Sequence, residues 1–266
     1  MTDEPDAHST SAEMAVAATP EQVWEAITTA SGSAAWSFRA DVEPRQGGAV
    51  QIHRGPFGPD ASATVTEWDP PNRFAYVERA EPPEPVIATE FLIQARERGS
   101  CVVRVVNTFH ADGEGWDHIA EEAGAGWRMS LLLLRSYVSH FPGMSATRLD
   151  LTEPVRAPAS ARAEIGSLVK SSLGLGGLSD GAPFHTPANA PQAQGIIEHI
   201  GPYFVLLRTK WPTTGLFAVS SFPMDAVTVS INVAGRLYGA DADTIAAREQ
   251  PEWHEWLARL VAEIEH

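Results

Sequence analysis

Cysteine is nearly absent from this sequence, which contains Cys101 and no other thiol among its 266 residues. A single cysteine excludes an internal disulfide and any zinc or iron–sulfur site that needs several thiolates. Cys101 is followed by Val102 and Val103, and a cysteine in such an apolar run is typically a small buried side chain. Because the sequence shows no clear set of metal ligands and no complete cofactor motif, we expect neither a metal nor a cofactor.

Basic residues are also scarce. Lys and Arg together number 19 against 34 Asp and Glu, which gives a formal net charge of −15 at pH 7. Proteins bind nucleic acids and anionic membranes mainly through clustered Lys and Arg side chains. A chain this acidic is therefore expected to bind neither nucleic acid nor membrane.

Long apolar runs are missing as well. Stretches such as Leu131–Leu134 are far shorter than the ~20 residues of a membrane-spanning helix. The opening residues MTDEPDAHSTSAE lack the basic and then apolar order of a secretory signal. We therefore expect a cytoplasmic protein.

Residues near the beginning of the chain predict the start of a helix. Thr19 can cap a helix, Pro20 suits the first helical position, and Gln22 can complete a capping box. The apolar spacing that follows predicts a helix to about Ala30, which ends in a loop at residues 31–33.

Short strands and then one long helix follow in the first half. Five segments with strand character and turn residues between them are 49–54, 61–68, 73–79, 86–94 and 101–110. Apolar residues then recur at steps of three and four, at Ile119, Ala123, Trp127, Leu131, Leu134 and Val138. This spacing is typical of an amphipathic helix. The order of elements predicts an α+β fold, with a curved antiparallel sheet around the long helix.

The second half repeats the first in weaker form. A shift of 126 residues aligns the long helix with the end of the chain without a gap, including the pairs Trp127/Trp253, Leu131/Leu257 and Leu134/Leu260. Upstream, Val155–Ala161 resembles Val16–Val23, and Glu198–Pro202 resembles Glu67–Pro71. Such self-similarity indicates two copies of one fold.

These patterns give the expected domain organisation. Residues 1–12 are polar and are expected to form a flexible tail, residues 13–145 a complete domain, and residues 146–266 a diverged second copy. The segment Leu173–Ala190 is rich in Gly, Ser, Pro and Ala, which predicts a loose loop in that second copy.

Several of these motifs together are similar to those of a known family. They are ATPEQVWEAIT at residues 18–28, Trp36, the strand entry Glu43–Gly48, the turn Glu67–Pro71 and the pair Gly126–Trp127. They resemble the START-like (SRPBCC) proteins, and more narrowly the branch of homologues of the activator of the heat-shock chaperone ATPase. The resemblance covers residues 13 to about 141. It implies a helix-grip fold, in tandem here, with a cavity between the sheet and the long helix.

The resemblance also suggests which residues border that cavity. The predicted ligand-binding residues are Trp36, Trp68, Phe91, Asn107, Phe109, Trp127 and Leu131. The alternative for the aromatic residues is that they simply fill the core. Asn107 lies on the strand face expected to be buried, so its amide needs a partner, which is either the backbone, water or a ligand.

Two histidines are the candidates for catalysis. His53 and His110 lie at or near strand ends, where an imidazole could act as a general base, although solvated histidines are common there. The leading hypothesis is binding of a small hydrophobic molecule in the cavity between the curved sheet and the long helix of the first domain. The alternatives are an enzyme of the cyclase, hydratase or hydrolase kind that uses no metal, and a protein that interacts with a chaperone. A monomer or a weak homodimer is expected.

Overall fold

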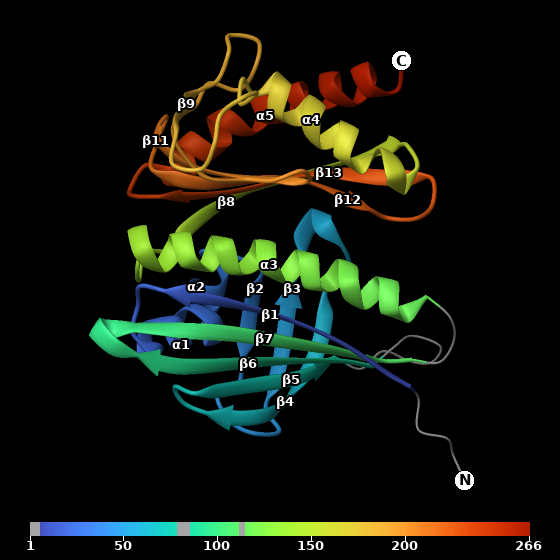
Figure 1. The fold of residues 1–266 in the computed structure, drawn as a ribbon. Helices are drawn as coiled ribbons and strands as arrows, with labels where there is room; N and C mark the ends of the chain where they lie inside the picture. Colours follow the sequence, from blue (N-terminus) through green and yellow to red (C-terminus); the bar gives the residue numbers. More distant parts are fainter. Residues whose placement is uncertain (1–5, 79–85, 112–114) are drawn as a thin grey trace. The chain divides into compact units, whose positions relative to one another are not determined.

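In the computed structural model, the protein consists of two tandem α+β domains, each built on one antiparallel sheet (Figure 1). The structure describes residues 6–78, 86–111 and 115–266. Backbone contacts divide the chain into Met1–Arg54 with Pro59–Gly143, and Gly55–Gly58 with Met144–His266. The α+β class and the tandem repeat, both predicted from the sequence, are confirmed.

The first domain contains a seven-stranded antiparallel sheet in the order β1-β7-β6-β5-β4-β3-β2. Its strands are β1 (Ala7–Val16), β2 (Arg39–Val42), β3 (Ala49–His53), β4 (Ala61–Asp69), β5 (Arg73–Glu78), β6 (Val86–Arg96) and β7 (Ser100–His110). The five strands predicted between residues 49 and 110 are confirmed to within two residues at each end. Alternate residues are buried along the central parts of β6 and β7, as expected for a sheet with one covered face.

Strand β1 corrects one expectation. Residues 7–12, predicted as part of a flexible tail, form the first part of β1 and pair with β7 from Ala7 opposite His110 to Val16 opposite Cys101. The polar sequence conceals this strand because β1 is an edge strand whose outer face is solvated. Residues 1–5 lie outside the described part of the chain.

The predicted helix start is confirmed. The Thr19 side chain accepts from the Gln22 backbone N–H, and the Gln22 side chain accepts from the Thr19 N–H, at the start of α1 (Pro20–Thr28). The predicted loop at residues 31–33 is wrong, because these residues belong to the short helix α2 (Ala30–Ala34). Thr29 caps α2 by accepting a 3.0 Å hydrogen bond from the Gly32 N–H.

The long helix α3 (Trp116–His140) packs on β1 and β7. Leu131, Leu134 and Val138 of the predicted apolar stripe are buried, but Ile119 is exposed. Ala120 and Gly124 face the sheet instead, and a Cβ added to Gly124 would lie 2.3 Å from Thr10 Oγ1 of β1. The absence of a side chain at Gly124 thus allows close approach of the helix to the sheet.

The second domain repeats this plan with one strand fewer. Its six-stranded sheet has the order β8-β13-β12-β11-β10-β9. The strands are β8 (Ala146–Arg156), β9 (Pro183–His185), β10 (Gln194–Ile200), β11 (Phe204–Trp211), β12 (Gly215–Pro223) and β13 (Thr228–Tyr238). Two helices, α4 (Arg162–Ser172) and α5 (Ala242–Ile264), lie on one face of the sheet (Figure 1).

The segment predicted as a loose loop is more ordered than expected. Leu173 and Leu175 are fully buried, and β9 with the buried Phe184 lies within the segment. These apolar side chains join the core that α4 and α5 cover. The Gly- and Pro-rich composition therefore describes the turns of the segment rather than its mobility.

Both sheets carry a β-bulge at the same topological place. In β4 the extra residue is Thr66, which follows Val65, and in β10 it is Glu198, which follows Ile197. The sequence alignment of Glu67 with Glu198 is therefore one residue out of register. The two bulges give a structural reference point from which equivalent rows of residues can be read across the two sheets.

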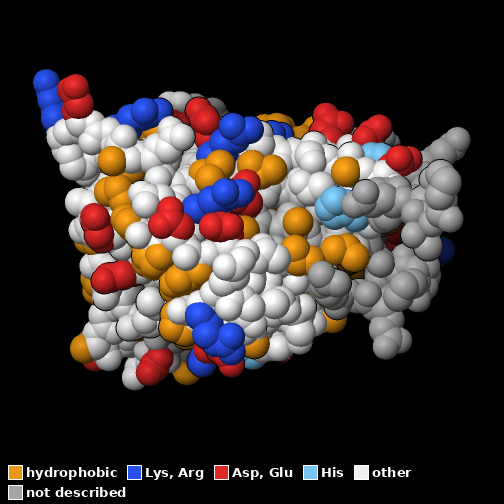
Figure 2. Space-filling view, turned by 90° about the horizontal axis from the view of Figure 1, so that it is seen from below, with side chains coloured by type: hydrophobic (Ala, Val, Ile, Leu, Met, Phe, Trp, Pro, Cys, Tyr) orange, Lys and Arg blue, Asp and Glu red, His pale blue; other side chains and the backbone are white. Residues whose placement is uncertain are grey.

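Surface charge and hydropathy agree with the composition. No helix among the described residues has a stretch apolar and long enough to cross a membrane. Figure 2 shows acidic and basic side chains close beside one another and interspersed with apolar ones. On the outer face of the first sheet, Arg73 and Glu90 form such a pair at 2.5 Å.

Candidate functional site

A row of polar side chains crosses the inner face of the first sheet. Tyr76, Thr89 and Asn107 stand opposite one another on β5, β6 and β7, and Thr10 of β1 continues the row. Asn107 Nδ2 donates to Thr89 Oγ1 at 2.9 Å and to the Ala88 carbonyl at 3.2 Å. Burial raises the pKa of Tyr76 far above its ordinary value, while a hydrogen bond with Thr89 opposes the rise. The row is a connected network inside the domain.

The second domain has an apolar row at the same place. Counted from the bulge in β10, the residues that stand opposite one another on β11, β12, β13 and β8 are Leu207, Phe217, Gly235 and Leu149. A Cβ added to Gly235 would lie 2.9 Å from the ring of Phe217, so that ring occupies the space where the first domain has Asn107. The first domain alone therefore keeps hydrogen-bonding groups in this row.

Aromatic rings form a second feature of the first domain. Trp68 lies 5.6 Å from Phe74 between ring centroids, Phe74 lies 6.2 Å from Phe91, and Phe91 lies 5.5 Å from Trp127 of α3. Trp24 of α1 closes the series with an edge-to-face contact to Trp68 at 4.9 Å. The predicted residues Trp68, Phe91 and Trp127 thus belong to one chain of rings.

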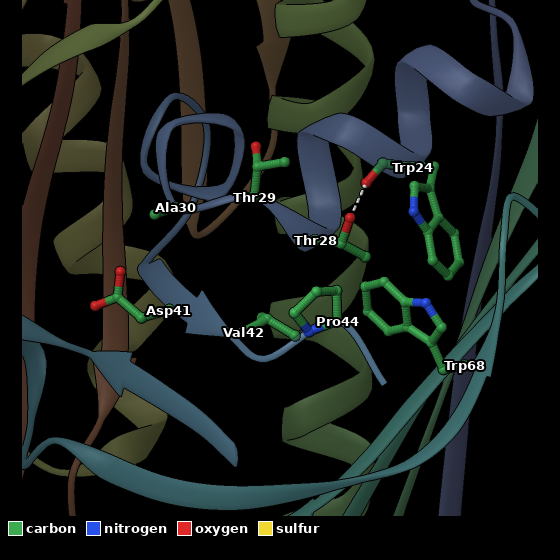
Figure 3. A pocket seen from close by; sticks show the side chains of 8 residues that line it. All are labelled: Trp24, Thr28, Thr29, Ala30, Asp41, Val42, Pro44 and Trp68. Carbon is green, nitrogen blue, oxygen red and sulfur yellow. Dashed lines mark hydrogen bonds between the residues drawn. The ribbon is translucent and has the colours of Figure 1, made fainter. Parts of the chain in front are cut away.

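An open pocket lies at the Trp24–Trp68 end of this chain of rings, and because none of its lining residues belongs to α3 it is not the cavity predicted between the sheet and the long helix. Its volume is about 420 Å³. The lining residues come from α1, α2, β2 and β4 and the segments beside them, and they are Trp24, Thr28, Thr29, Ala30, Asp41, Val42, Pro44 and Trp68 (Figure 3). Two indoles form one wall, while Val42 and Pro44 add apolar surface. A concave, mostly apolar surface with a few polar groups is the usual form of a small-molecule site.

Phe91 and Trp127 do not line the pocket, and the other four predicted ligand-binding residues lie outside both the pocket and the chain of rings. The Trp36 indole N–H donates to the Ala26 carbonyl at 2.8 Å, inside the core. Phe109 packs against Trp116 with 6.1 Å between ring centroids, and Leu131 is a fully buried residue of α3. Asn107 belongs to the polar row, where Thr89 and the backbone satisfy its amide nitrogen. Trp68 is the predicted residue that lines the pocket.

His53 is held by two carboxylates. Its Nε2 lies 2.8 Å from Asp41 Oδ2 and its Nδ1 lies 3.1 Å from Asp60 Oδ2. Both ring nitrogens donate only in the imidazolium form, and the hydrogen bonds that they donate to Asp41 and then Asp60 raise the pKa of His53. Arg39 and His53 in turn lower the pKa of Asp41 through the hydrogen bonds they donate. Because this arrangement favours the imidazolium form of His53, the ring is better placed to supply a proton than to act as a general base.

The second candidate for catalysis has a different setting. His110 ends β7, opposite Ala7 of β1 and Val86 of β6, and it is not among the pocket residues. Within the described residues, no group of three His, Cys, Asp or Glu side chains is arranged to hold a metal ion.

Sequence reasoning missed most of the pocket. Trp24 lies in the segment whose apolar spacing predicts the first helix, and Asp41, Thr28 and Thr29 belong to no motif of a binding site. Tyr76 and Thr89 could have been found from strand alternation, which places both on the buried face. Their alignment with Asn107 depends on strand register, which the sequence does not state.

The geometry defines the protein as a tandem of helix-grip domains, with a pocket and a buried polar row in the first. Residues 17–139 match the family described as Activator of Hsp90 ATPase homolog 1-like protein. The match spans most of the first domain, which is thus similar to that START-like family, and the second domain repeats the same fold plan. No curated protein sequence matches the chain.

Three solved structures are similar in fold. The di-domain ARO/CYC BexL from the BE-7585A biosynthetic pathway is 12% identical, with 97% of each chain covered and a TM-score of 0.45. DynU16, a putative protein in the dynemicin biosynthetic locus, is 17% identical, with 97% of this chain and 98% of that chain covered and a TM-score of 0.45. Protein MLL2253 from Mesorhizobium loti is 17% identical, covering 50% of this chain and 98% of its own, with a TM-score of 0.45.

Proposed function

We propose that the first domain binds one small, largely apolar molecule in the pocket walled by Trp24 and Trp68. The observation that carries this proposal is the pocket itself, about 420 Å³ in volume and lined mainly by apolar and aromatic side chains. Pockets for small organic ligands typically measure ~300–1,000 Å³. Aromatic rings supply large contact areas there at little entropic cost.

The contrast between the domains supports the same assignment. The first domain holds Tyr76, Thr89 and Asn107 in its inner row, whereas the second holds Leu207, Phe217 and Gly235 there. Buried polar groups cost stability unless they are hydrogen-bonded, so a fold that needs only a core does better with the apolar row. We therefore assign binding to the first domain and a structural role to the second.

Binding of an uncharged fluorescent naphthylamine probe tests the proposal. Ala30→Phe fills the pocket from α2, and Trp68→Ala removes one wall. We expect each to weaken probe binding roughly tenfold or more, while Trp211→Ala, which changes an exposed tryptophan of β11, leaves the affinity unchanged. Circular dichroism of each variant checks that it is folded. Unchanged affinity in a folded Ala30→Phe protein would contradict the proposal.

A catalytic use of the same pocket is the second candidate. It rests on Asp41, which both lines the pocket and accepts from His53 at 2.8 Å. In this case the proton that His53 Nε2 donates to Asp41 reaches a bound polyketide-like or ester substrate through Asp41, because His53 itself does not line the pocket. His53→Gln should then abolish turnover while probe affinity is kept. Turnover that is unchanged in His53→Gln, or absent in the wild type, would reject catalysis by His53.

A further inference from the structure

The two threonine hydroxyl groups that line the pocket already donate their hydrogens to acceptors within the protein. Thr28 Oγ1 donates to the Trp24 carbonyl at 2.8 Å, the contact drawn as a dashed line in Figure 3. Thr29 Oγ1 donates to the Glu25 carbonyl at 2.7 Å and accepts from the Gly32 N–H at 3.0 Å. A hydroxyl has one hydrogen to donate and two lone pairs. Both threonines can therefore offer a ligand lone pairs only.

The acidic group of the pocket offers acceptors as well. Asp41 Oδ1 accepts from Arg39 Nη2 at 2.8 Å and Nε at 3.2 Å, and Oδ2 accepts from His53 Nε2. An ionised carboxylate has about two lone-pair sites on each oxygen, so the two bonds from Arg39 fill those of Oδ1 and one site remains on Oδ2. Arg39 and His53 lower the pKa of Asp41, which keeps the group ionised at neutral pH.

The other side chains that line the pocket offer a ligand few hydrogen-bond donors. Ala30, Val42 and Pro44 have no polar side-chain atoms, and no lining residue is Lys, Arg or His. Among the eight lining side chains, the indole N–H groups of Trp24 and Trp68 are the available donors, and they are uncharged. The chain as a whole carries a net charge of −15, which also repels anions.

We infer that the pocket selects a flat molecule whose polar groups are hydroxyl or amine donors and which carries no negative charge. The inference rests on the proposed binding function and specifies its ligand class. A flat ring system packs against the two indoles, while its O–H or N–H groups meet Thr28, Thr29 and Asp41. A carboxylate or phosphate would face Asp41 without a lining cation to neutralise it.

Three probes on one ring frame test this selection by isothermal titration calorimetry. Naphthol donates a hydrogen bond, its methyl ether does not, and the naphthoate anion carries a negative charge. We expect naphthol to bind roughly tenfold more tightly than the ether, because a hydrogen bond to a charged acceptor is lost, and naphthoate to bind more weakly still.

Variants assign the preference to named groups. Asp41→Asn removes the charge and introduces an amide donor, so the preference for naphthol over the ether should fall about fivefold and naphthoate should bind more tightly. Thr28→Val, which keeps the side-chain shape, should reduce the preference by a smaller factor. Asp60→Asn is the matched control, since it also removes a carboxylate from His53 but does not line the pocket. It should leave the preference unchanged.

The outcomes separate the two proposals. If none of the three probes binds, the binding function itself fails. If all three bind to the wild type with equal affinity, or naphthoate binds most tightly, binding stands and the inference is overturned. A preference that is equally reduced by Asp60→Asn and Asp41→Asn would also overturn it, because the effect would then arise from His53 rather than from the pocket lining.

Discussion

Asn107 and Thr89 are joined across β7 and β6 by a 2.9 Å hydrogen bond, and the residues at the same places in the second domain are Gly235 and Phe217. One copy of the fold thus has a polar connection where the other has an aromatic ring. The polar pair makes the inner face of the first domain dependent on complete hydrogen bonding, because a buried group that loses its partner is costly.

The first prediction concerns this pair. Thr89→Val should lower the free energy of unfolding of the first domain by about 1–3 kcal/mol, since it leaves buried groups of Tyr76 and Asn107 short of a partner. Urea denaturation followed by circular dichroism measures the change. Thr108→Val is the control, because its hydroxyl bonds Ser9 on the exposed face and its loss should have little effect. Thr89→Val with Asn107→Leu should be more stable than Thr89→Val alone, and the opposite result would refute the argument.

The second prediction concerns pH. The pKa of His53 is raised above its ordinary value of 6.5 by hydrogen bonds to Asp41 and Asp60. Its contribution to stability is therefore complete below pH 6.5 and is lost as the pH rises through the higher folded-state value. Asp41 acts in the opposite sense: its contribution is present above its ordinary pKa of 3.8 and is lost as the pH falls through the lower folded-state value.

An NMR titration of the His53 ring protons measures this directly. The midpoint should lie above 6.5 in the wild type. It should fall in both Asp41→Asn and Asp60→Asn, and more in the former, because Asp41 is the stronger of the two influences. A wild-type midpoint at or below 6.5 would be inconsistent with the paired geometry.

The third prediction compares the two equivalent tryptophans of the long helices. Trp253 is 2% exposed and stacks on Phe217 with 4.9 Å between ring centroids, whereas Trp127 is partly exposed and meets Phe91 edge-on. Trp253→Ala should lower the stability of the second domain by about 3–5 kcal/mol, and Trp127→Ala should cost the first domain less. Thermal or urea unfolding of each variant checks the order. Equal losses would mean that the two sites are packed alike.

The fourth prediction concerns the boundary between the domains. A chain that ends at Ser145 should fold alone, because it retains the whole seven-stranded sheet and α3. Its unfolding in urea should be a single cooperative transition. A broad transition, or loss of the near-ultraviolet circular dichroism signal, would show that the first domain needs the second one to fold.

Local chemistry in the sequence was sufficient to predict the main elements. Thr19, Pro20 and Gln22 specify a helix start through contacts within four residues of chain, and the strands from 49 to 110 are separated by visible turn residues. The same local reasoning failed at Ser31–Ser33, since a small polar segment gives no sign of a helix unless the Thr29 cap is recognised. It also failed at β1, whose polar sequence is stabilised by pairing with β7.

The sequence did not show which residues of neighbouring strands pair with one another. The 126-residue shift aligns α3 with α5 correctly, but the connection from β13 to α5 is shorter than that from β7 to α3, so the strands follow a different shift. The Gly113/Gly239 pairing implied by the 126-residue shift lies outside the described residues on one side. The pocket was hidden for the same reason, because Trp24, Asp41 and Trp68 meet only through tertiary packing.

The apolar row of the second domain should tolerate substitutions more readily than the polar row of the first domain. At Leu207 and Phe217 only the volume and shape of the side chain matter for packing. Exchanges among apolar residues of similar size should therefore cost little stability there. The hydrogen-bonded row is more restrictive, because the side chains of Tyr76, Thr89 and Asn107 must also keep their donors and acceptors in place. No apolar substitution at a single one of these positions does so. Random mutagenesis with selection for folded protein should therefore give a permissive profile in one copy of the fold and a restrictive one in the other.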